Sequence, residues 1–373
     1  MADSASLPRR TQTSSPVPGA SPKPVRTSWR TSAPSYPLVS QTNMPSHKHE
    51  RCPISLGAVR LGALLFSQAT TWKGFRDAAV LADRIGYEHV WTWDHLYAIF
   101  GDPYQPIFEG WTALAALSGV TSRARLGLMV GANTFRNPGI VAKMAATLDH
   151  ASDGRAIVGL GAAWFDLEHQ AHGLEFGATA GARLRWLEES VGIVRDLLDG
   201  KEVTYRSDKY GFDHARHLPR PVQRRVPIMI GGGGEKKTLR IVARYADMCN
   251  LQGTLDVLKH KDEVLREHCR DLGRNDQEIE RTVLIRPVIR DDPAEAERIW
   301  QSQMRHNKVP PDDPKTAHVA GTVNDLARLL RDFAGVGYDT LIAELPSPFD
   351  RETIERLATE VRPMVESAAA PAR

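Results

Sequence analysis

The chain has few cysteines and no long apolar run, and these absences remove several classes of protein. Its 373 residues include three cysteines, Cys52, Cys249 and Cys269, with no Cys-x-x-Cys pair. A disulfide framework or zinc ribbon is therefore unsupported, and a reducing cytoplasm is the expected location. No apolar stretch approaches the roughly 18 residues that a spanning helix needs, so no membrane partner is expected.

A basic domain is also missing. The formal net charge is +3, but residues 1–52 hold seven Lys or Arg against two acidic residues, which leaves −2 for the rest of the chain. A nucleic-acid partner is therefore not expected. The same 52 residues include 18 Ser or Pro and show no apolar periodicity, which predicts a disordered tail before a folded domain at 53–367. Alternatively, this segment is an organellar transit peptide, or translation starts at Met44.

Three motifs of common enzyme classes are absent. The chain has no Gly-x-Gly-x-x-Gly followed by a ribose-binding acid, and no Gly-x-x-x-x-Gly-Lys-[Ser/Thr], so neither a Rossmann dinucleotide site nor a P-loop is supported. It has no Gly-x-Ser-x-Gly, so a serine hydrolase is unsupported as well.

What the chain does contain is a regular alternation of short apolar runs and helical patterns. The runs lie at 61–66, 88–93, 125–130, 156–160, 226–230, 247–251, 281–289 and 340–344. Eight strand-then-helix units predict an α/β fold, a (β/α)8 TIM barrel with parallel strands. The rival is a doubly wound open sheet, which the count of eight and the missing Rossmann fingerprint disfavour. Residues 201–220 differ from the alternation and predict a hairpin insertion.

Four consecutive glycines, Gly231, Gly232, Gly233 and Gly234, separate the fifth run from a helical pattern. Glycine loses more backbone entropy on folding than any other residue, so such a run needs a reason. Close approach of free amides and a helix N-terminus to a phosphate is one reason, and we favour it. A loose loop whose glycines allow tight packing is the alternative.

In a barrel of this kind the active site lies at the C-terminal ends of the strands. That rule selects Asp94, His95, Asn133, Arg136, Gly161, Trp164, Glu168, the four glycines, Asn250 and Gln252. His95 is a candidate general base or hydrogen-bond donor, or else a partner of Asp94 that holds a loop. Arg136 either binds an anionic ligand or forms a salt bridge to Asp94 or Glu109.

The tryptophans and the histidine pairs also allow either a functional or a structural role. Trp164 and Trp93 could stack on a planar cofactor, whereas Trp91 and Trp111 are expected to be core. Two His-x-x-His spacings, His169 with His172 and His214 with His217, resemble metal ligands. Neither has a convincing third ligand in its own segment, so no metal is expected.

Several motifs together resemble the bacterial luciferase-like monooxygenase superfamily, most closely its deazaflavin (coenzyme F420)-dependent branch. The resemblance covers about residues 55–365. The motifs are 90–96 (VWTWDHL), 108–112 (FEGWT), 126–130 (LGLMV), 134–138 (TFRNP), 143–149 (KMAATLD), 152–155 (SDGR) and 159–164 (GLGAAW).

The resemblance implies a barrel with a flavin or deazaflavin in its mouth. The cofactor phosphate would lie at Gly231–Gly234, and Asp94 and His95 would lie near the ring as catalytic residues. A non-proline cis peptide at Met129–Val130 would support the ring. Asn133, Gly161 and Trp164 complete the expected cofactor-binding set.

The resemblance also implies a function and its alternatives. F420-dependent hydride transfer to or from a small organic substrate is favoured, and an FMNH2-dependent monooxygenase that uses O2 and a partner reductase is the alternative. A non-catalytic flavin-binding protein and a barrel lyase or isomerase for phosphorylated substrates are weaker options. A homodimer is a further expectation. Members that oxidise sugar phosphates carry a tryptophan and a glutamate where an ungapped alignment places Ile99 and Trp164, which puts that substrate class in doubt.

Overall fold

The structure is a computed structural model that describes residues 59–310, 313 and 317–369. The expected tail at 1–52 lies outside the described residues, so its boundary stays a prediction. The strands of the central sheet are β1 (Arg60–Leu65), β2 (His89–Thr92), β3 (Arg125–Leu128), β4 (Gly131–Ala132), β5 (Ala156–Gly161), β8 (Ile228–Gly231), β9 (Met248–Leu251), β10 (Glu280–Ile285) and β13 (Thr340–Leu345).

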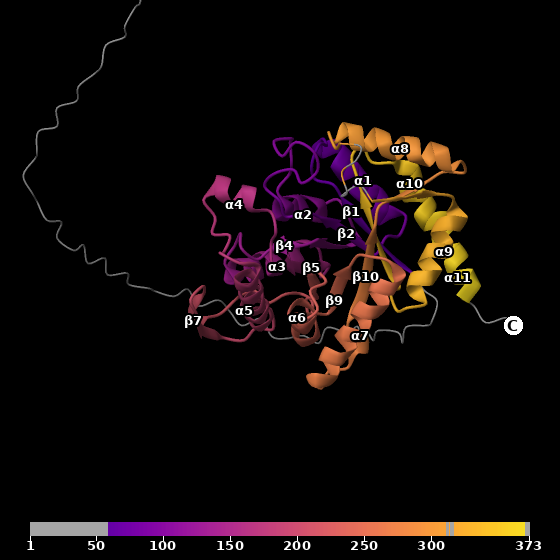
Figure 1. Cartoon of the computed structure of the whole chain (residues 1–373). Helices are drawn as coiled ribbons and strands as arrows, with labels where there is room; N and C mark the ends of the chain where they lie inside the picture. Colours follow the sequence, from indigo (N-terminus) through magenta and orange to yellow (C-terminus); the bar gives the residue numbers. More distant parts are fainter. Residues whose placement is uncertain (1–58, 311–312, 314–316, 370–373) are drawn as a thin grey trace, which may run out of the picture. The chain divides into compact units, whose positions relative to one another are not determined.

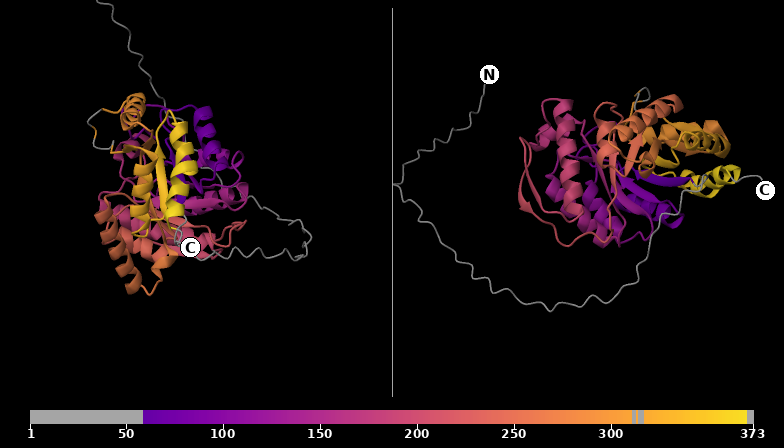
Figure 2. Two further views of the ribbon diagram at one scale, coloured as in Figure 1. Left: turned by 90° about the vertical axis from the view of Figure 1, so that its right-hand side faces the viewer. Right: turned by 90° about the horizontal axis from the view of Figure 1, so that it is seen from below.

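The central sheet is parallel and closes on itself. Its order is β3-β2-β1-β13-β10-β9-β8-β5-β4, and β3 also pairs with β5. Because β4 continues the path of β3 and pairs with β5, the nine strands occupy eight positions of a barrel. Helices surround the strands (Figures 1 and 2). The predicted (β/α)8 barrel is confirmed.

The helices are α1 (Trp72–Arg84), α2 (Gly110–Ser118), α3 (Pro138–Ala151), α4 (Asp166–His172), α5 (Ala180–Leu198), α6 (Thr238–Tyr245), α7 (Leu255–Asp271), α8 (Pro293–His306), α9 (Val323–Ala334), α10 (Arg351–Arg356) and α11 (Arg362–Ala369). A 3-10 turn, η1 (Asp276–Glu278), precedes β10, and a π-helical turn, η3 (Leu357–Val361), joins α10 to α11. An antiparallel hairpin of β6 (Val203–Arg206) and β7 (Gly211–Ala215) lies beside α5 (Figure 1).

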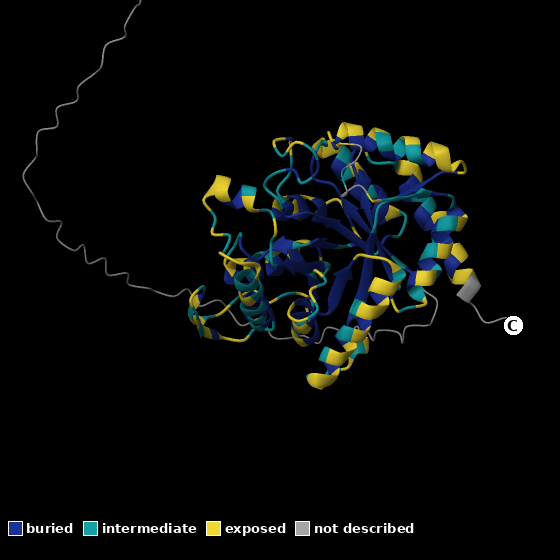
Figure 3. Ribbon diagram, in the orientation of Figure 1, coloured by how far each residue is buried: buried dark blue, intermediate teal, exposed yellow. Residues whose placement is uncertain are grey.

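Alternation along the strands divides the core into two layers. On β1, Leu61, Ala63 and Leu65 belong to the layer between strands and helices, whereas Leu64 belongs to the cluster inside the barrel. Trp91 is fully buried inside the barrel. A Cβ on Gly62 or Gly127 would come within 3.0 or 2.5 Å of its indole, so these glycines provide its space. Figure 3 shows buried strands and helices exposed on their outer sides.

Two expected strands are shorter than the sequence patterns indicate. The third ends at Leu128, before the cis peptide Met129–Val130. The seventh, expected over 281–289, ends at Ile285, and β11 (Pro287–Ile289) pairs instead with β12 (Val319–Gly321) in a separate small sheet. A proline lacks the N–H that a central ladder needs, which agrees with the break before Pro287.

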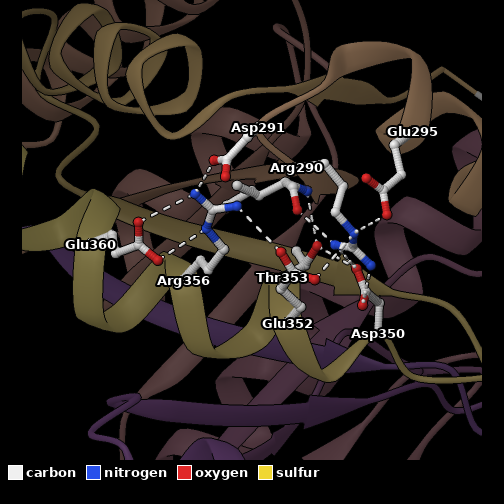
Figure 4. A network of polar contacts seen from close by, with 9 residues as sticks. Arg290, Asp291, Glu295, Asp350, Glu352, Thr353, Arg356 and Glu360 are labelled. Atoms are coloured by element: carbon white, nitrogen blue, oxygen red, sulfur yellow. Dashed lines mark hydrogen bonds and ion pairs between the residues drawn. The ribbon is translucent and has the colours of Figure 1, made fainter.

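A polar network holds α10 against β11. The Arg290 guanidinium binds the Asp350 carboxylate at 2.9 Å, and Arg356 binds Glu352 and Glu360 on its own helical segment (Figure 4). The Thr353 hydroxyl accepts a hydrogen bond from the backbone N–H of Ile289. We assign this network a structural role, because it fixes the helix that follows β13.

Candidate functional site

Most of the predicted site residues line one cavity of about 730 Å³ at the C-terminal ends of the strands. Those that line it are Asp94, His95, Met129, Val130, Gly161, Trp164, Glu168, Gly231, Gly232, Gly233, Gly234, Asn250 and Gln252. A second hollow, of about 830 Å³, runs between α1 and α10. None of the predicted site residues lines it, so the cavity at the mouth is the candidate site.

His95 pairs with Glu168, which comes from α4 across the mouth. The imidazole Nδ1 lies 2.9 Å from Glu168 Oε1, and the backbone N–H of Leu96 donates to Glu168 Oε2 at 2.8 Å. Glu168 is 1% exposed, and as an ionised carboxylate it would accept a hydrogen bond from a proton on Nδ1. Among the described residues nothing bonds Nε2, and this nitrogen is therefore available to a ligand. The expected alternative partner, Asp94, does not contact His95.

Asp94 forms part of the wall instead. Its Oδ2 accepts hydrogen bonds from the Ala132 N–H at 3.0 Å and from Arg136 at 2.7 Å, and Arg136 also binds Glu109 at 2.7 Å. The salt-bridge alternative for Arg136 is thus confirmed, with both expected partners. Burial raises the pKa of Asp94, and the Arg136 charge opposes that shift. Through these contacts Asp94 holds β4 in place.

Val130 projects against two glycines of neighbouring strands. A Cβ on Gly161 would lie 2.6 Å from Val130 Cγ2, and one on Gly231 would lie 2.9 Å from the same atom. The peptide that precedes Val130 is cis, as the family resemblance implies. Glycine at both positions therefore lets the Val130 side chain stand between β5 and β8 in the cavity wall.

The glycine run presents free amides to the cavity. No group among the described residues accepts a hydrogen bond from the N–H of Gly232, Gly233 or Gly234. Gly232 has φ +113°, a conformation that favours glycine. Helix α6 begins at Thr238, after a turn at 235–237, and no side chain caps its N-terminus. Convergent backbone N–H groups beside an uncapped helix start are an anion-binding arrangement.

Asn133, like Arg136, is a predicted site residue that does not line the cavity. It is 1% exposed and lies behind the wall. With its amide oriented to satisfy both ends, the nitrogen donates to the Gly161 carbonyl at 2.8 Å and the oxygen accepts from the Leu187 N–H at 3.1 Å. In this structure its side-chain polar atoms join β5 to α5, and cofactor binding by Asn133 stays a prediction.

Of the four tryptophans, two are core and two lie at the cavity. Trp91 and Trp111 are core, as predicted. Trp93 is 3% exposed but touches the cavity, and Trp164 is 52% exposed at its rim, with its ring centroid 5.6 Å from that of His95.

Two cavity residues were missed by the sequence reasoning. Glu344 ends the predicted eighth strand, and Arg286 follows β10; their side chains pair at 2.7 Å. Burial raises the pKa of Glu344, opposed by Arg286 and by a hydrogen bond from Trp93. The strand-end rule would have selected Glu344 had it been applied to the last strand.

His169 and His172, the first of the two histidine pairs with metal-ligand spacing, have other partners, and His214 of the second pair contacts Glu202. His169 contacts Thr134 Oγ1 through Nε2 and the Phe165 carbonyl through Nδ1, and His172 Nδ1 contacts the Glu168 carbonyl. In the described part of the chain, no group of three His, Cys, Asp or Glu residues is placed to hold a metal. No helix within that part is both long and apolar enough to span a membrane.

Comparison with known proteins places the chain in a family. The model of the luciferase-like monooxygenase family matches residues 56–354, so the chain belongs to that family and the resemblance is confirmed. An uncharacterized protein of Mycobacterium tuberculosis is 36% identical over 146 residues, 39% of this chain and 50% of that protein. The chain thus spans about half the length of that relative.

Two relatives match over more of their length. The F420-dependent glucose-6-phosphate dehydrogenase of Kineococcus radiotolerans is 28% identical over 78% of this chain and 92% of its own. The FMNH2-dependent dimethylsulfone monooxygenase of Pseudomonas fluorescens is 25% identical over 80% and 88%. An F420-dependent secondary alcohol dehydrogenase, solved with an F420–acetone adduct, superposes with a TM-score of 0.72 at 22% identity, over 83% of this chain and 99% of that one. This likeness supports the fold alone.

Proposed function

We propose that the protein is an oxidoreductase that binds coenzyme F420 and transfers hydride to or from a small organic substrate. The observation that carries the proposal is that the free amides of Gly232–Gly234 and the imidazole of His95 line the same cavity. A cavity of about 730 Å³ is within the range of ligand and cofactor sites.

Each part of the site has a role in this proposal. The bound deazaflavin supplies the carbon centre that exchanges hydride with the substrate. The glycine amides and the start of α6 hold a phosphate, and Val130 packs beneath the ring. His95 holds or accepts a proton at Nε2, while Glu168 keeps Nδ1 protonated and fixes the imidazole.

Charge beside the glycine run favours F420, with its long acidic tail, over FMN. Lys236 and Lys237 follow the run after Glu235, which pairs with Lys261, and both lysines are exposed. Lys237 Nζ lies 3.8 Å from the place of a Cβ on Gly181, so it stands between the starts of α5 and α6. Within the described residues neither lysine forms an ion pair, so both can bind an acidic tail that leaves the phosphate site.

An FMNH2-dependent monooxygenase, supplied by a reductase, is the second candidate. The similarity to the Pseudomonas monooxygenase is nearly equal to that to the Kineococcus dehydrogenase. A homodimer and a supplier of reduced cofactor stay predictions, as do Asp94 and His95 as the catalytic pair.

Cofactor titration tests the proposal. We expect F420 to bind at least about tenfold more tightly than FMN, measured by fluorescence quenching with purified protein. Lys237→Glu should weaken F420 binding several-fold more than FMN binding, whereas Lys259→Glu, an exposed lysine on α7, should change neither. Tighter binding of FMN would favour the monooxygenase, and no binding of either compound would overturn both candidates.

A further inference from the structure

The half of the cavity away from the glycine run contains one buried ion pair in an apolar wall. Arg286 Nε lies 2.7 Å from Glu344 Oε2, and the side chains are 15% and 5% exposed. The pair stands at the ends of β10 and β13, which lie opposite β3 and β5 in the closed strand order. Leu64, Phe100 and Leu284 line the cavity around it.

Both partners of this pair are held in place. Arg286 Nη1 donates to the Ala317 carbonyl at 3.2 Å, and the guanidinium carbon lies 5.2 Å from the centre of the Phe100 ring. Trp93 is among the groups that oppose the rise in the pKa of Glu344. A charge pair so fixed offers a ligand an acceptor and a donor side by side, without rearrangement.

The balance of charge decides what this half of the cavity can accept. An anion placed here would be attracted by Arg286 and repelled by Glu344. A cation would be repelled by Arg286 and attracted by Glu344. A neutral group that both donates and accepts hydrogen bonds satisfies both partners and keeps the pair intact. The other charged residues that line the described wall, Asp94, His95 and Glu168, lie on the side of β2 and α4.

We propose that the substrate is an uncharged, largely apolar compound whose hydroxyl or amide group binds the Arg286–Glu344 pair, and that sugar phosphates are disfavoured. This inference rests on the proposed function, because a ring held between the glycine run and Val130 leaves this half for the substrate. The apolar body contacts Leu64, Phe100 and Leu284, and the anchored group orients it toward the ring and His95.

A matched pair of probes tests the inference. Cyclohexylmethanol and cyclohexanecarboxylate are titrated into the cofactor-loaded protein, with inorganic phosphate added to fill any vacant glycine loop, and binding is read from the probes' own NMR lines. The wild type should prefer the alcohol. Glu344→Gln leaves Arg286 as a net positive charge and should shift the ratio of dissociation constants toward the carboxylate by at least about tenfold.

The double variant Arg286→Gln/Glu344→Gln is the matched control. It removes both charges, so it should restore the preference for the alcohol, and circular dichroism verifies that each variant is folded. A wild type that prefers the carboxylate, or a ratio unchanged within about twofold in Glu344→Gln, would overturn the inference. Since NMR reads the probes themselves, the same titrations without cofactor separate a failure of this inference from a failure of the cofactor assignment.

Discussion

At the scale of single residues, the imidazole at the mouth derives its geometry from a distant segment. His95 follows β2, and its partner Glu168 lies on α4, 73 positions later in the chain. Local pattern selected both residues as strand-end candidates but could not pair them, because the contact exists only once β2 and β5 are joined through β3. The nearer acid, Asp94, is used by Arg136 and Ala132 instead.

If His95 handles the substrate proton, its removal should affect turnover more than binding. We expect His95→Gln to lower kcat by about 10² to 10⁴, the usual contribution of a general acid or base, with cofactor affinity nearly unchanged. Glu168→Gln should cost about 10² through misplacement of the ring. Steady-state kinetics with a proven substrate measures both, and His150→Gln at the far end of α3 is the control. Wild-type turnover in His95→Gln would remove the imidazole from the proton transfer.

The crowding of Val130 gives a second prediction at this scale. Gly161→Ala would place a Cβ 2.6 Å from Val130 Cγ2, so we expect a loss of about 1 to 3 kcal/mol in the free energy of unfolding. Gly211→Ala on the outer hairpin is the control, since a Cβ there meets nothing within 4 Å. Urea unfolding of the two variants measures the difference. Equal stability would show that Val130 can move aside at no cost.

At the scale of elements, the helix ends show where local chemistry suffices. A threonine directly before a helical pattern is a common N-cap. At the start of α9 the structure shows the full capping box: the Thr322 hydroxyl accepts from the Asp325 N–H, and the Asp325 carboxylate accepts from the Thr322 N–H. This interaction spans three residues, which is why it can be read from the chain. For the seventh strand, Pro287 marks the break locally, but the pairing of β11 with β12 depends on a segment more than 30 residues later in the chain.

Removal of the Thr322 hydroxyl should therefore weaken α9. Thr322→Ala is expected to lower the free energy of unfolding by about 1 kcal/mol, as for other N-cap threonines. Ser302→Ala, at an exposed position within α8, should stay within about 0.5 kcal/mol of the wild type. Chemical denaturation compares the two, and similar losses would contradict a specific capping role.

At the scale of the whole molecule, the closed barrel was predictable and the use of its interior only in part. Eight apolar runs at regular spacing are sufficient for the topology, because parallel strands joined by helices have few alternatives. The strand-end rule placed His95, Trp164 and Gly231–Gly234 around one cavity. It also selected Asn133, whose side chain joins β5 to α5 behind the wall, because the end of a strand does not show on which side of the wall an amide lies.

The opposite end of the barrel contains a histidine that should make stability depend on pH. His89, on β2, is 3% exposed. Burial, assisted by the charges of Arg125 and Arg60, lowers its pKa to about 3 from the ordinary 6.5. Between these values the unfolded chain binds a proton that the folded barrel does not bind. The stabilisation is therefore complete above the unfolded pKa and is lost as the pH falls through this window.

Measured stability should show this linkage directly. Below about pH 6, the free energy of unfolding of the wild type should fall relative to that of His89→Gln by up to about 1.4 kcal/mol per pH unit. Urea unfolding of both proteins at about pH 7.5, 6 and 5 gives the difference in slope, and any constant cost of the substitution cancels. Parallel curves would show that the barrel accommodates a protonated imidazole at this position. In that case Arg60 on β1 and Arg125 on β3, the two strands beside β2, would have to move away from the charged imidazole without unfolding the sheet.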